Sequence, residues 1–246
     1  MYNYQIIVEY EGTNFVGWQF QKNGLSIQEI IQKSLKRILK KDIFIYGSGR
    51  TDSGVHAWGQ SAHFKTDVPI TSNNKLLKSL NFFLKKHSIS IISIKKKNIN
   101  FHARFSAKKR FYKYLILNRE SPTPLYEKRV WHVKKKIDYK IMKKAAKLLV
   151  GKKDFSTFRA ASCGAKSAIK DLEKISINKK NNLIEITFIS KSFLQQQVRS
   201  MTGCLKYVGE KKWNLKKFKQ VIDSKKREFC APPAPAYGLY LYKVKY

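Results

Sequence analysis

Acidic residues and cysteines are scarce in this sequence, and long apolar runs are missing. Asp and Glu number 16 against 51 Lys and Arg, which leaves a formal net charge of +35 in 246 residues. The three cysteines stand far apart along the chain without metal-ligand spacing. They predict no disulfide framework and favour a reducing cytoplasm. No stretch approaches the roughly 18 consecutive apolar residues of a transmembrane helix, and the first residues carry no secretory leader pattern, so we expect neither feature.

The most prominent property of the sequence is its large positive charge, because the rest of its composition is ordinary for a globular protein. Hydrophobic residues make up 43% and aromatic residues 13% of the chain, which excludes a disordered basic tail. Such a charge indicates a polyanionic partner, because each Lys or Arg placed on a phosphate releases condensed counterions. A second source of the charge stays open. Nine of the basic residues are arginine and 42 are lysine, and codon drift in an AT-rich genome enriches lysine.

Hydrophobic periodicity predicts an α+β protein. Apolar residues alternate over 4–10, as in a strand, and Ser26 with Glu29 forms a capping box at the start of a helix. Further strands are expected at 43–46, 61–65, 89–94, 111–117, 169–178, 183–189 and 237–246, and further helices at 73–86, 138–149, 192–208 and 215–224. Similar elements recur in the two halves of the chain, so we expect two related subdomains of mostly antiparallel sheet flanked by helices.

The densest segment runs from Gly47 to Ala57. Three glycines within eight residues leave its backbone free to approach a ligand closely. Asp52 is the single acid among them and stands two residues after Arg50. The segment lacks the Gly-Lys-Ser/Thr ending of a phosphate-binding P-loop. A lone carboxylate in a glycine-rich turn is more often a turn former or a helix cap, so these features alone assign no function.

As one string, residues 49–60 closely resemble the signature of the tRNA pseudouridine synthase A family, with Ser53 where the family usually has alanine. Other family motifs match in the same order at 10–19, 26–29, 101–107, 110–114, 154–159, 193–209 and 234–241. The matches cover essentially the whole chain. Gln197 departs from the pattern, since many members have methionine there, and this concerns the packing of a helix rather than the chemistry.

The resemblance implies an isomerase that converts uridine in tRNA to pseudouridine. The N1–C1′ glycosidic bond is broken, the uracil turns, and C5 is joined to C1′. One carboxylate suits this reaction, because no water is consumed, whereas glycoside hydrolysis needs two. Asp52 would be the nucleophile and would attack either C1′ or the uracil ring. Arg199 would pair with Asp52, and Arg50 would enter the helical stack as the target nucleotide leaves. A nearby guanidinium favours an ionised carboxylate, while burial opposes it.

The resemblance also implies how the substrate is held. Tyr112 would stack on the uracil, and Leu239 would close the other side of the pocket. The remaining substrate-binding candidates lie inside matched motifs and are Thr51, Gly54, His56, Arg104 and Arg110. The implied architecture is the pseudouridine synthase fold. Its active-site cleft would lie between an N-terminal subdomain at 1–105, which carries the aspartate loop, and a C-terminal subdomain at 106–246.

The implied substrate is tRNA, modified at uridines 38, 39 and 40 of the anticodon stem-loop by a cytoplasmic homodimer. A uridine in a stem must be flipped out before it can react. We expect no membrane association, no partner that carries a cofactor, no cofactor and no metal, since the five histidines do not cluster. Two alternatives are a non-catalytic RNA-binding protein that retained the fold and a nuclease. The nuclease fits poorly, because the sequence offers no carboxylate cluster for Mg²⁺.

Overall fold

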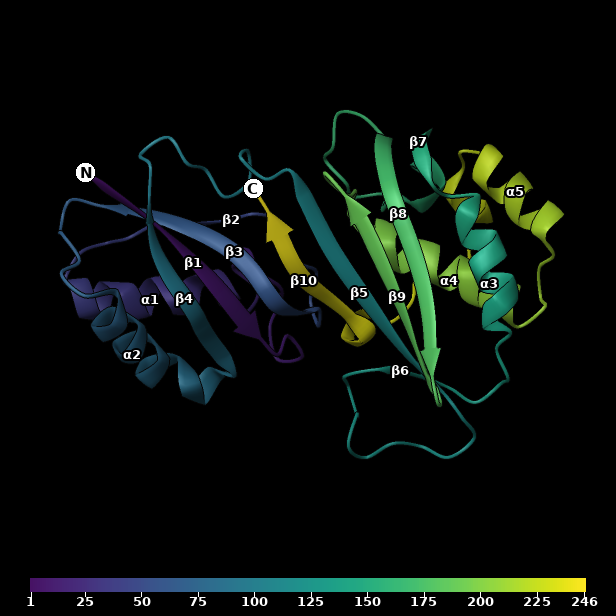
Figure 1. The fold of residues 1–246 in the computed structure, drawn as a ribbon, viewed down its shortest axis with the longest axis horizontal. Helices are drawn as coiled ribbons and strands as arrows, with labels where there is room; N and C mark the ends of the chain where they lie inside the picture. The colour runs from purple at the N-terminus through teal and green to yellow at the C-terminus, as the bar shows by residue number, and fades with distance from the viewer. The chain divides into compact units, whose positions relative to one another are not determined.

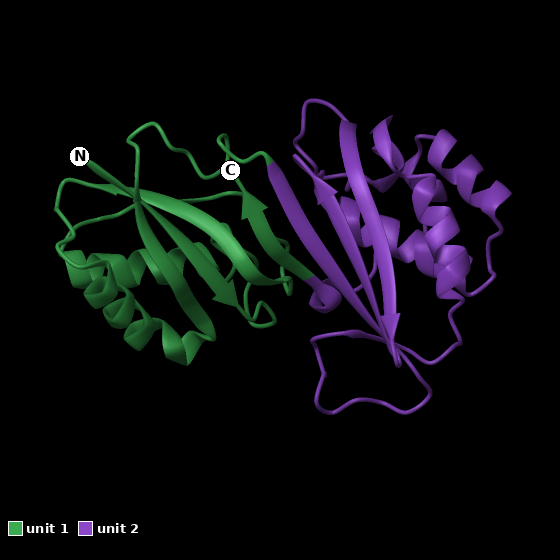
Figure 2. Cartoon of the chain, viewed as in Figure 1, with its two compact units in different colours: residues 1–108, 240–246 green, residues 109–239 purple.

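Contacts along the chain divide the protein into two units, which the computed structural model describes over all 246 residues. Residues 1–108 and 240–246 form unit 1, and residues 109–239 form unit 2 (Figure 2). Each unit is built on a mostly antiparallel sheet that carries helices, which confirms the predicted α+β class. No helix combines the length and the apolar character that crossing a bilayer requires.

Unit 1 contains five strands and two α-helices (Figure 1). They are β1 (Tyr2–Tyr10), α1 (Ile27–Leu39), β2 (Ile45–Gly47), β3 (His56–Thr66), α2 (Asn73–Leu84), β4 (Ile89–Lys97) and β10 (Leu239–Lys245), with the 3-10 turn η1 (Lys85–His87) after α2. The strand order is β4-β1-β3-β10, and β2 also pairs with β3. Strand β10 runs parallel to β3 with Tyr240 opposite His56, whereas the other pairs are antiparallel.

The core of unit 1 follows from the alternation read in the sequence. Ile6 and Val8 of β1 are fully buried, and so are Ile31 and Leu35 of α1. The helices α1 and α2 lie together against the sheet (Figure 1). The predicted cap of α1 is confirmed, because the Ser26 hydroxyl accepts the Glu29 N–H at 3.2 Å.

Unit 2 contains the remaining strands and three α-helices (Figure 1). They are β5 (Lys109–Asn118), β6 (Trp131–Val133), α3 (Tyr139–Lys147), β7 (Gly151–Asp154), β8 (Ile169–Lys180), β9 (Leu183–Ser190), α4 (Gln197–Gly209) and α5 (Leu215–Asp223), with the 3-10 turns η2 (Ser156–Phe158), η3 (Arg227–Phe229) and η4 (Ala236–Gly238). The order β5-β9-β8-β7 is antiparallel throughout, and β6 runs parallel to β5. Helix α3 packs on β8 and on α4.

One predicted helix start was wrong. The helix expected to begin at Ser192 begins at Gln197, because Gln196 takes the left-handed conformation with φ of 60°. The segment before α4 is irregular, and the side-chain oxygen of Gln197 accepts the Leu194 N–H of this segment at 2.8 Å. Gln197 is buried, so its departure from the family pattern falls in the packing of α4.

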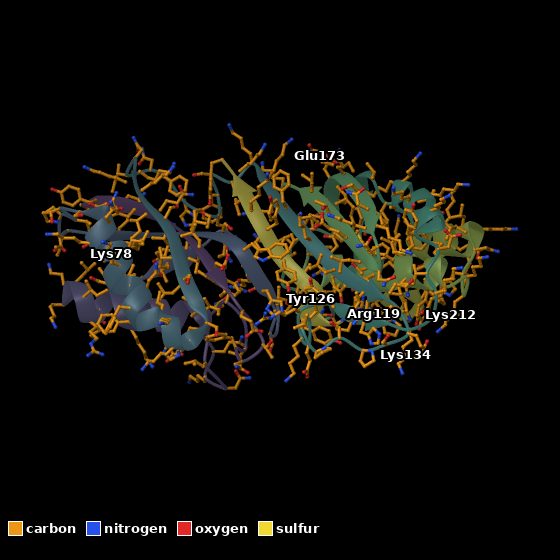
Figure 3. All side chains as sticks on the ribbon, turned by 60° about the horizontal axis from the view of Figure 1, so that its bottom comes forward. Lys78, Arg119, Tyr126, Lys134, Glu173 and Lys212 are labelled. Atoms are coloured by element: carbon orange, nitrogen blue, oxygen red, sulfur yellow. The ribbon has the colours of Figure 1, made fainter.

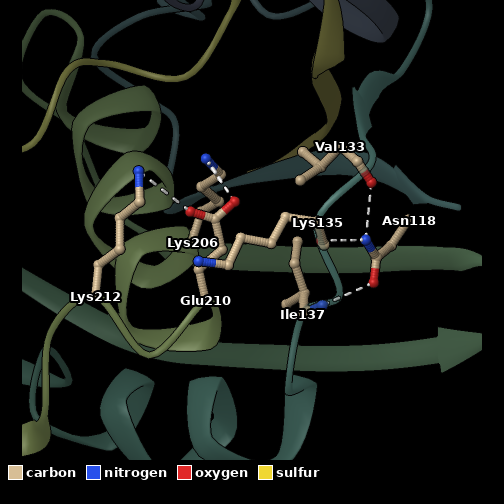
Figure 4. Close-up of polar contacts among 7 residues, drawn as sticks. All are labelled: Asn118, Val133, Lys135, Ile137, Lys206, Glu210 and Lys212. Atoms are coloured by element: carbon tan, nitrogen blue, oxygen red, sulfur yellow. Dashed lines mark hydrogen bonds and ion pairs between the residues drawn. The ribbon is translucent and has the colours of Figure 1, made fainter. Parts of the chain in front are cut away.

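Two polar side chains brace the ends of β5 and α4 (Figure 4). The Asn118 amide donates to the carbonyl groups of Val133 and Lys135, each at 2.8 Å, and accepts the Ile137 N–H at 2.9 Å. The Glu210 carboxylate is buried and lies 2.7 Å from the Lys206 ammonium and 3.6 Å from that of Lys212. These contacts fix the segment between β6 and α3 and the end of α4.

The cysteines are closer in space than their sequence positions indicate. Cys204 of α4 and Cys230 are 26 residues apart along the chain, yet their sulfur atoms lie 3.5 Å from each other. Both are free thiols. Cys163 is also free and is buried.

Lysine side chains extend into solvent from both units. Examples are Lys78 on α2, Lys134 after β6 and Lys212 after α4, all exposed (Figure 3).

Candidate active site

The Asp52 loop connects β2 to β3 in unit 1. The Asp52 carbonyl accepts the Val55 N–H at 3.2 Å, which closes a tight turn, and Gly54 takes the positive φ of 76° that this turn requires. Asp52 is partly exposed, and Arg50 is exposed. The turn therefore presents its single carboxylate at the surface of unit 1.

Two glycines of the segment after β1 allow backbone to lie directly against this loop. A Cβ on Gly12 would lie 2.0 Å from the Val55 carbonyl oxygen. A Cβ on Gly17, whose φ is +115°, would lie 2.5 Å from the Thr51 carbonyl oxygen. The Trp18 N–H donates to that same Thr51 oxygen at 3.2 Å. Only glycine fits at these two positions, so the motif at 10–19 serves the position of Asp52.

Side chains hold the loop from both directions. The Thr51 and Tyr10 hydroxyl groups are hydrogen-bonded at 2.8 Å and both residues are buried. The Ser53 hydroxyl donates to the Phe15 carbonyl at 2.9 Å. On the other side, the Gln60 amide donates to the Gly49 carbonyl at 2.7 Å. The residues directly before and after Asp52, Thr51 and Ser53, are therefore both held by hydrogen bonds.

His56 joins the loop to two other segments. Its ring is 2% exposed, and its Nδ1 accepts the Gly12 N–H at 2.9 Å. The Glu11 carboxylate lies 3.6 Å from the same nitrogen, and the Tyr240 ring of β10 lies 4.8 Å from the imidazole. The structure therefore gives His56 a place in the scaffold of the loop.

Unit 2 holds Tyr112 and Arg110 on one face of β5. Tyr112 is buried and meets the Phe193 ring edge to face, with centroids 5.2 Å apart. Arg110 is buried two residues earlier, and its guanidinium donates to the Lys191 carbonyl. Both side chains contact the segment that connects β9 to α4.

Arg199 lies in the first turn of α4 and is tied to the segment before β10. Its Nε donates to the Ala234 carbonyl at 2.8 Å, and the Ala234 N–H donates to the Arg199 carbonyl at 3.0 Å. A Cβ on Gly203 would lie 2.1 Å from the Pro232 oxygen, so this segment packs directly on the helix.

Tyr114 fixes the continuation of that segment. Its hydroxyl donates to the Pro235 carbonyl at 2.8 Å. Burial raises the pKa of Tyr114 well above its usual value, which keeps the phenol protonated as the donor. The chain then reaches Leu239, which is 6% exposed at the start of β10.

The predicted site residues fall into two groups, one in each unit. Unit 1 brings Arg50, Thr51, Asp52 and Gly54 together in one loop, with His56 directly after it as the first residue of β3, and carries Arg104 on the connection after β4. Unit 2 holds Arg110, Tyr112, Arg199 and Leu239. Sequence reasoning assigned no role to six residues that support the site: Tyr10, Gly12, Gly17, Gln60, Tyr114 and Gly203. The sequence did contain a signal that could have identified these residues, since all six stand inside the matched motifs. No group of three or more His, Cys, Asp or Glu side chains is arranged to hold a metal ion.

A family model described as tRNA pseudouridine synthase matches residues 6–106 and 145–246. The chain belongs to the tRNA pseudouridine synthase family. It is 57% identical over 246 residues, with full coverage of both chains, to tRNA pseudouridine synthase A of Pelagibacter ubique. It is 41% identical, again over the full length of both, to the protein of that name from Parvibaculum lavamentivorans. The counterpart from Maricaulis maris is 41% identical over all of this chain and 98% of its own.

This family assignment confirms the resemblance read from the motifs. Pseudouridine synthases are isomerases, so the chain is an isomerase, and the reaction of its family is the isomerisation of uridine in tRNA. The family match includes the Asp52 loop, Arg199 and Leu239. Arg110 and Tyr112 lie between the two matched stretches, within the full-length similarity to the relatives.

Proposed function

We propose that this tRNA pseudouridine synthase acts on uridines 38, 39 and 40 of the anticodon stem-loop, with Asp52 as the nucleophile. The observation that carries the role of Asp52 is the geometry of its loop. Asp52 is the single acid of a turn against which Gly12 and Gly17 pack backbone to backbone. A carboxylate presented from so constrained a turn suits attack at one defined atom. The tRNA positions follow from the resemblance of the motifs.

The proposed reaction needs no external reactant. Asp52 attacks C1′ or the uracil ring, the N1–C1′ bond breaks, and the uracil turns before C5 bonds to C1′. The bond from Asp52 to C1′ or to the ring breaks again in this sequence, which restores the free carboxylate. C5 then loses its proton and N1 takes one up, so the product has the composition of the substrate. Asp52 must be ionised to attack, and pairing with Arg199 would favour the ionised form.

We assign the contacts with the uracil base of the target uridine to residues of unit 2. Tyr112 would stack on the uracil, Leu239 would cover its other side, and Arg50 would take the place of the flipped nucleotide. Arg104, Arg110, Thr51, Gly54 and His56 complete the proposed substrate-binding set. Buried aromatic and apolar side chains suit this task, because they keep water from the detached base. Subdomains at 1–105 and 106–246, a homodimer, and action in the cytoplasm without a cofactor belong to the same proposal.

The experiment that tests the proposal is the substitution Asp52→Asn, which keeps the size of the side chain and removes its charge. We expect pseudouridine formation in unmodified tRNA to fall on the order of 10⁴-fold or more, as when other enzymes lose a nucleophile. Pseudouridine would be mapped along the strand, which also tests the three positions. Affinity for tRNA should stay within about threefold, because the carboxylate contributes little to phosphate contacts.

Asp42→Asn is the matched control, because Asp42 is an exposed aspartate that pairs with Lys36 at 2.8 Å. It should leave turnover unchanged. Wild-type turnover by Asp52→Asn would refute the role of Asp52. Tight tRNA binding without any pseudouridine in the wild type would instead identify a non-catalytic RNA-binding protein.

A further inference from the structure

Four aromatic side chains of unit 1 contact one another in a continuous cluster, which we call the aromatic ladder: Tyr46, His63, His102 and Phe105. The rings of Tyr46 and His63 lie 5.3 Å apart and are nearly parallel at 28°. His63 lies 4.5 Å from His102 with the two rings tilted by 58°, and His102 lies 4.4 Å from Phe105 with a tilt of 36°. The ladder joins β2, β3 and the connection after β4.

The ladder ends in solvent. Phe105 is 74% exposed and Tyr46 is 51% exposed. Phe44 stands two residues before Tyr46 and is also exposed. Successive strand residues point to opposite faces, so the fully buried Ile45 and Phe64 point into the core of unit 1, while Tyr46 and His63 lie on the opposite face. There the connection after β4 covers His63, which is 2% exposed, so the accessible rings of the ladder are those of Tyr46 and Phe105. Large rings gathered in the open are a feature of binding surfaces rather than of ordinary protein surface.

Both imidazoles of the ladder are neutral. His63 Nδ1 accepts the Ala103 N–H at 3.2 Å, and His102 Nδ1 accepts the Arg104 N–H at 3.1 Å. Burial, with the neighbouring His102, lowers the pKa of His63 to about 4. Burial, with Arg104 and Lys65, also lowers the pKa of His102. Neutral imidazole rings stack as aromatic groups and add no charge to the row.

Positive charge stands beside the ladder rather than within it. The Arg104 guanidinium lies 5.5 Å from the centre of the Phe105 ring. Lys65 is exposed and stands two residues after His63 on the same face of β3. Rings flanked by cations match a nucleotide, whose base stacks and whose phosphate is negative. A second copy of the chain fits less well, because it would bring the same cations to this face.

We propose that the aromatic ladder is a stacking platform for an unpaired base of the tRNA substrate, with Arg104 and Lys65 contacting the adjacent phosphates. Proteins recognise single-stranded RNA by stacking splayed bases on aromatic side chains and by following the backbone with basic groups. This assignment rests on the proposed function in so far as tRNA is the ligand. It adds a binding contact that takes no part in breaking or forming the glycosidic bond.

The test compares Phe105→Ala with Phe105→Trp in the full-length protein. Removing the ring should weaken binding of unmodified tRNA about 5- to 100-fold, the range that alanine substitution of a base-stacking ring produces. The rate of pseudouridine formation at saturating enzyme should not change. Phe105→Trp should bind within about threefold of the wild type, because the indole keeps a stacking face. A short single-stranded RNA that carries 2-aminopurine should be quenched by the wild type and less so by Phe105→Ala.

Phe82→Ala is the matched control, because Phe82 on α2 is 78% exposed and lies outside the ladder. It should bind tRNA like the wild type. Equal affinity of Phe105→Ala and the wild type would overturn the proposal. A changed molecular mass of Phe105→Ala by sedimentation would also overturn it, since the ring would then belong to a contact between protein chains. Binding is measured apart from catalysis, so a wild type that forms no pseudouridine would refute the proposed function and leave the ladder comparison valid.

Discussion

At the scale of single residues, the glycines of the motif at 10–19 decide whether the Asp52 loop can form. A methyl group on Gly12 would meet the Val55 carbonyl oxygen at 2.0 Å, and backbone cannot turn aside as a side chain can. We expect Gly12→Ala to displace the loop and to lower the turnover of saturating tRNA about 100-fold, the cost of misplacing a reacting group by about 1 Å. The measurement is single-turnover pseudouridine formation.

Gly164→Ala provides the comparison for this substitution. An added Cβ at Gly164 meets nothing within 4 Å. Its turnover should equal that of the wild type. Similar losses in the two variants would show that the close approach at Gly12 is not what positions Asp52.

Residue roles were only partly predictable from the sequence. The resemblance of residues 49–60 to the family signature singled out Asp52, and the structure places this residue in a tight turn. The hydrogen bond between Tyr10 and Thr51 was not predictable, since it joins residues 41 positions apart and depends on how β1 pairs with β3. His56 shows the same limit. The motif made His56 a substrate-binding candidate, and its contacts with Gly12 and Tyr240, which support the loop, depend on packing that the motif does not reveal.

At the scale of secondary structure elements, α4 matters because it carries Arg199 at one end and the buried Glu210 at the other. The side chains of Lys206 and Glu210 are 15% and 2% exposed. We expect Glu210→Ala to lower the free energy of unfolding by roughly 3 kcal/mol, because breaking a buried pair leaves an ammonium group without its counter-charge. Urea denaturation followed by circular dichroism measures this change.

Glu228→Ala is the control at this scale, because the Glu228 side chain is 65% exposed and lies 3.9 Å from the Lys226 ammonium. Exposed pairs contribute less than about 1 kcal/mol. If the two variants unfold at the same urea concentration, the Glu210 pair does not stabilise the end of α4.

Elements with a long periodic pattern were the ones that the sequence predicted well. Strand β1 and helix α1 were both expected, because alternation or helical spacing runs along their whole length. Strands β6 and β7 were missed, since three and four residues are too few to show a period. The start of α4 was misplaced because apolar spacing does not reveal a left-handed residue such as Gln196.

At the scale of the whole molecule, the charge of +35 makes tRNA binding depend on salt. We expect the logarithm of the affinity to fall linearly with the logarithm of salt concentration, with a slope of about 0.9 for each duplex phosphate contacted. Six or more contacts would weaken binding about 10³-fold between roughly 50 and 200 mM salt. A filter-binding titration at several salt concentrations gives the slope.

The slope also separates the two sources of the charge. It counts the cations that contact phosphate, whereas lysines retained through codon drift contribute nothing to it. A slope near zero would contradict an electrostatic role in tRNA binding.

Strand β10 imposes an order on the synthesis of this protein. Its pairing with β3, the contact of Tyr240 with His56, and the bonds of the Tyr246 hydroxyl to Ser61 and Ala103 all belong to unit 1. The ribosome makes β10 only after it has made the whole of unit 2. The nascent first unit must therefore wait with an open sheet edge, and the scaffold behind the Asp52 loop is among the last parts of the molecule to close.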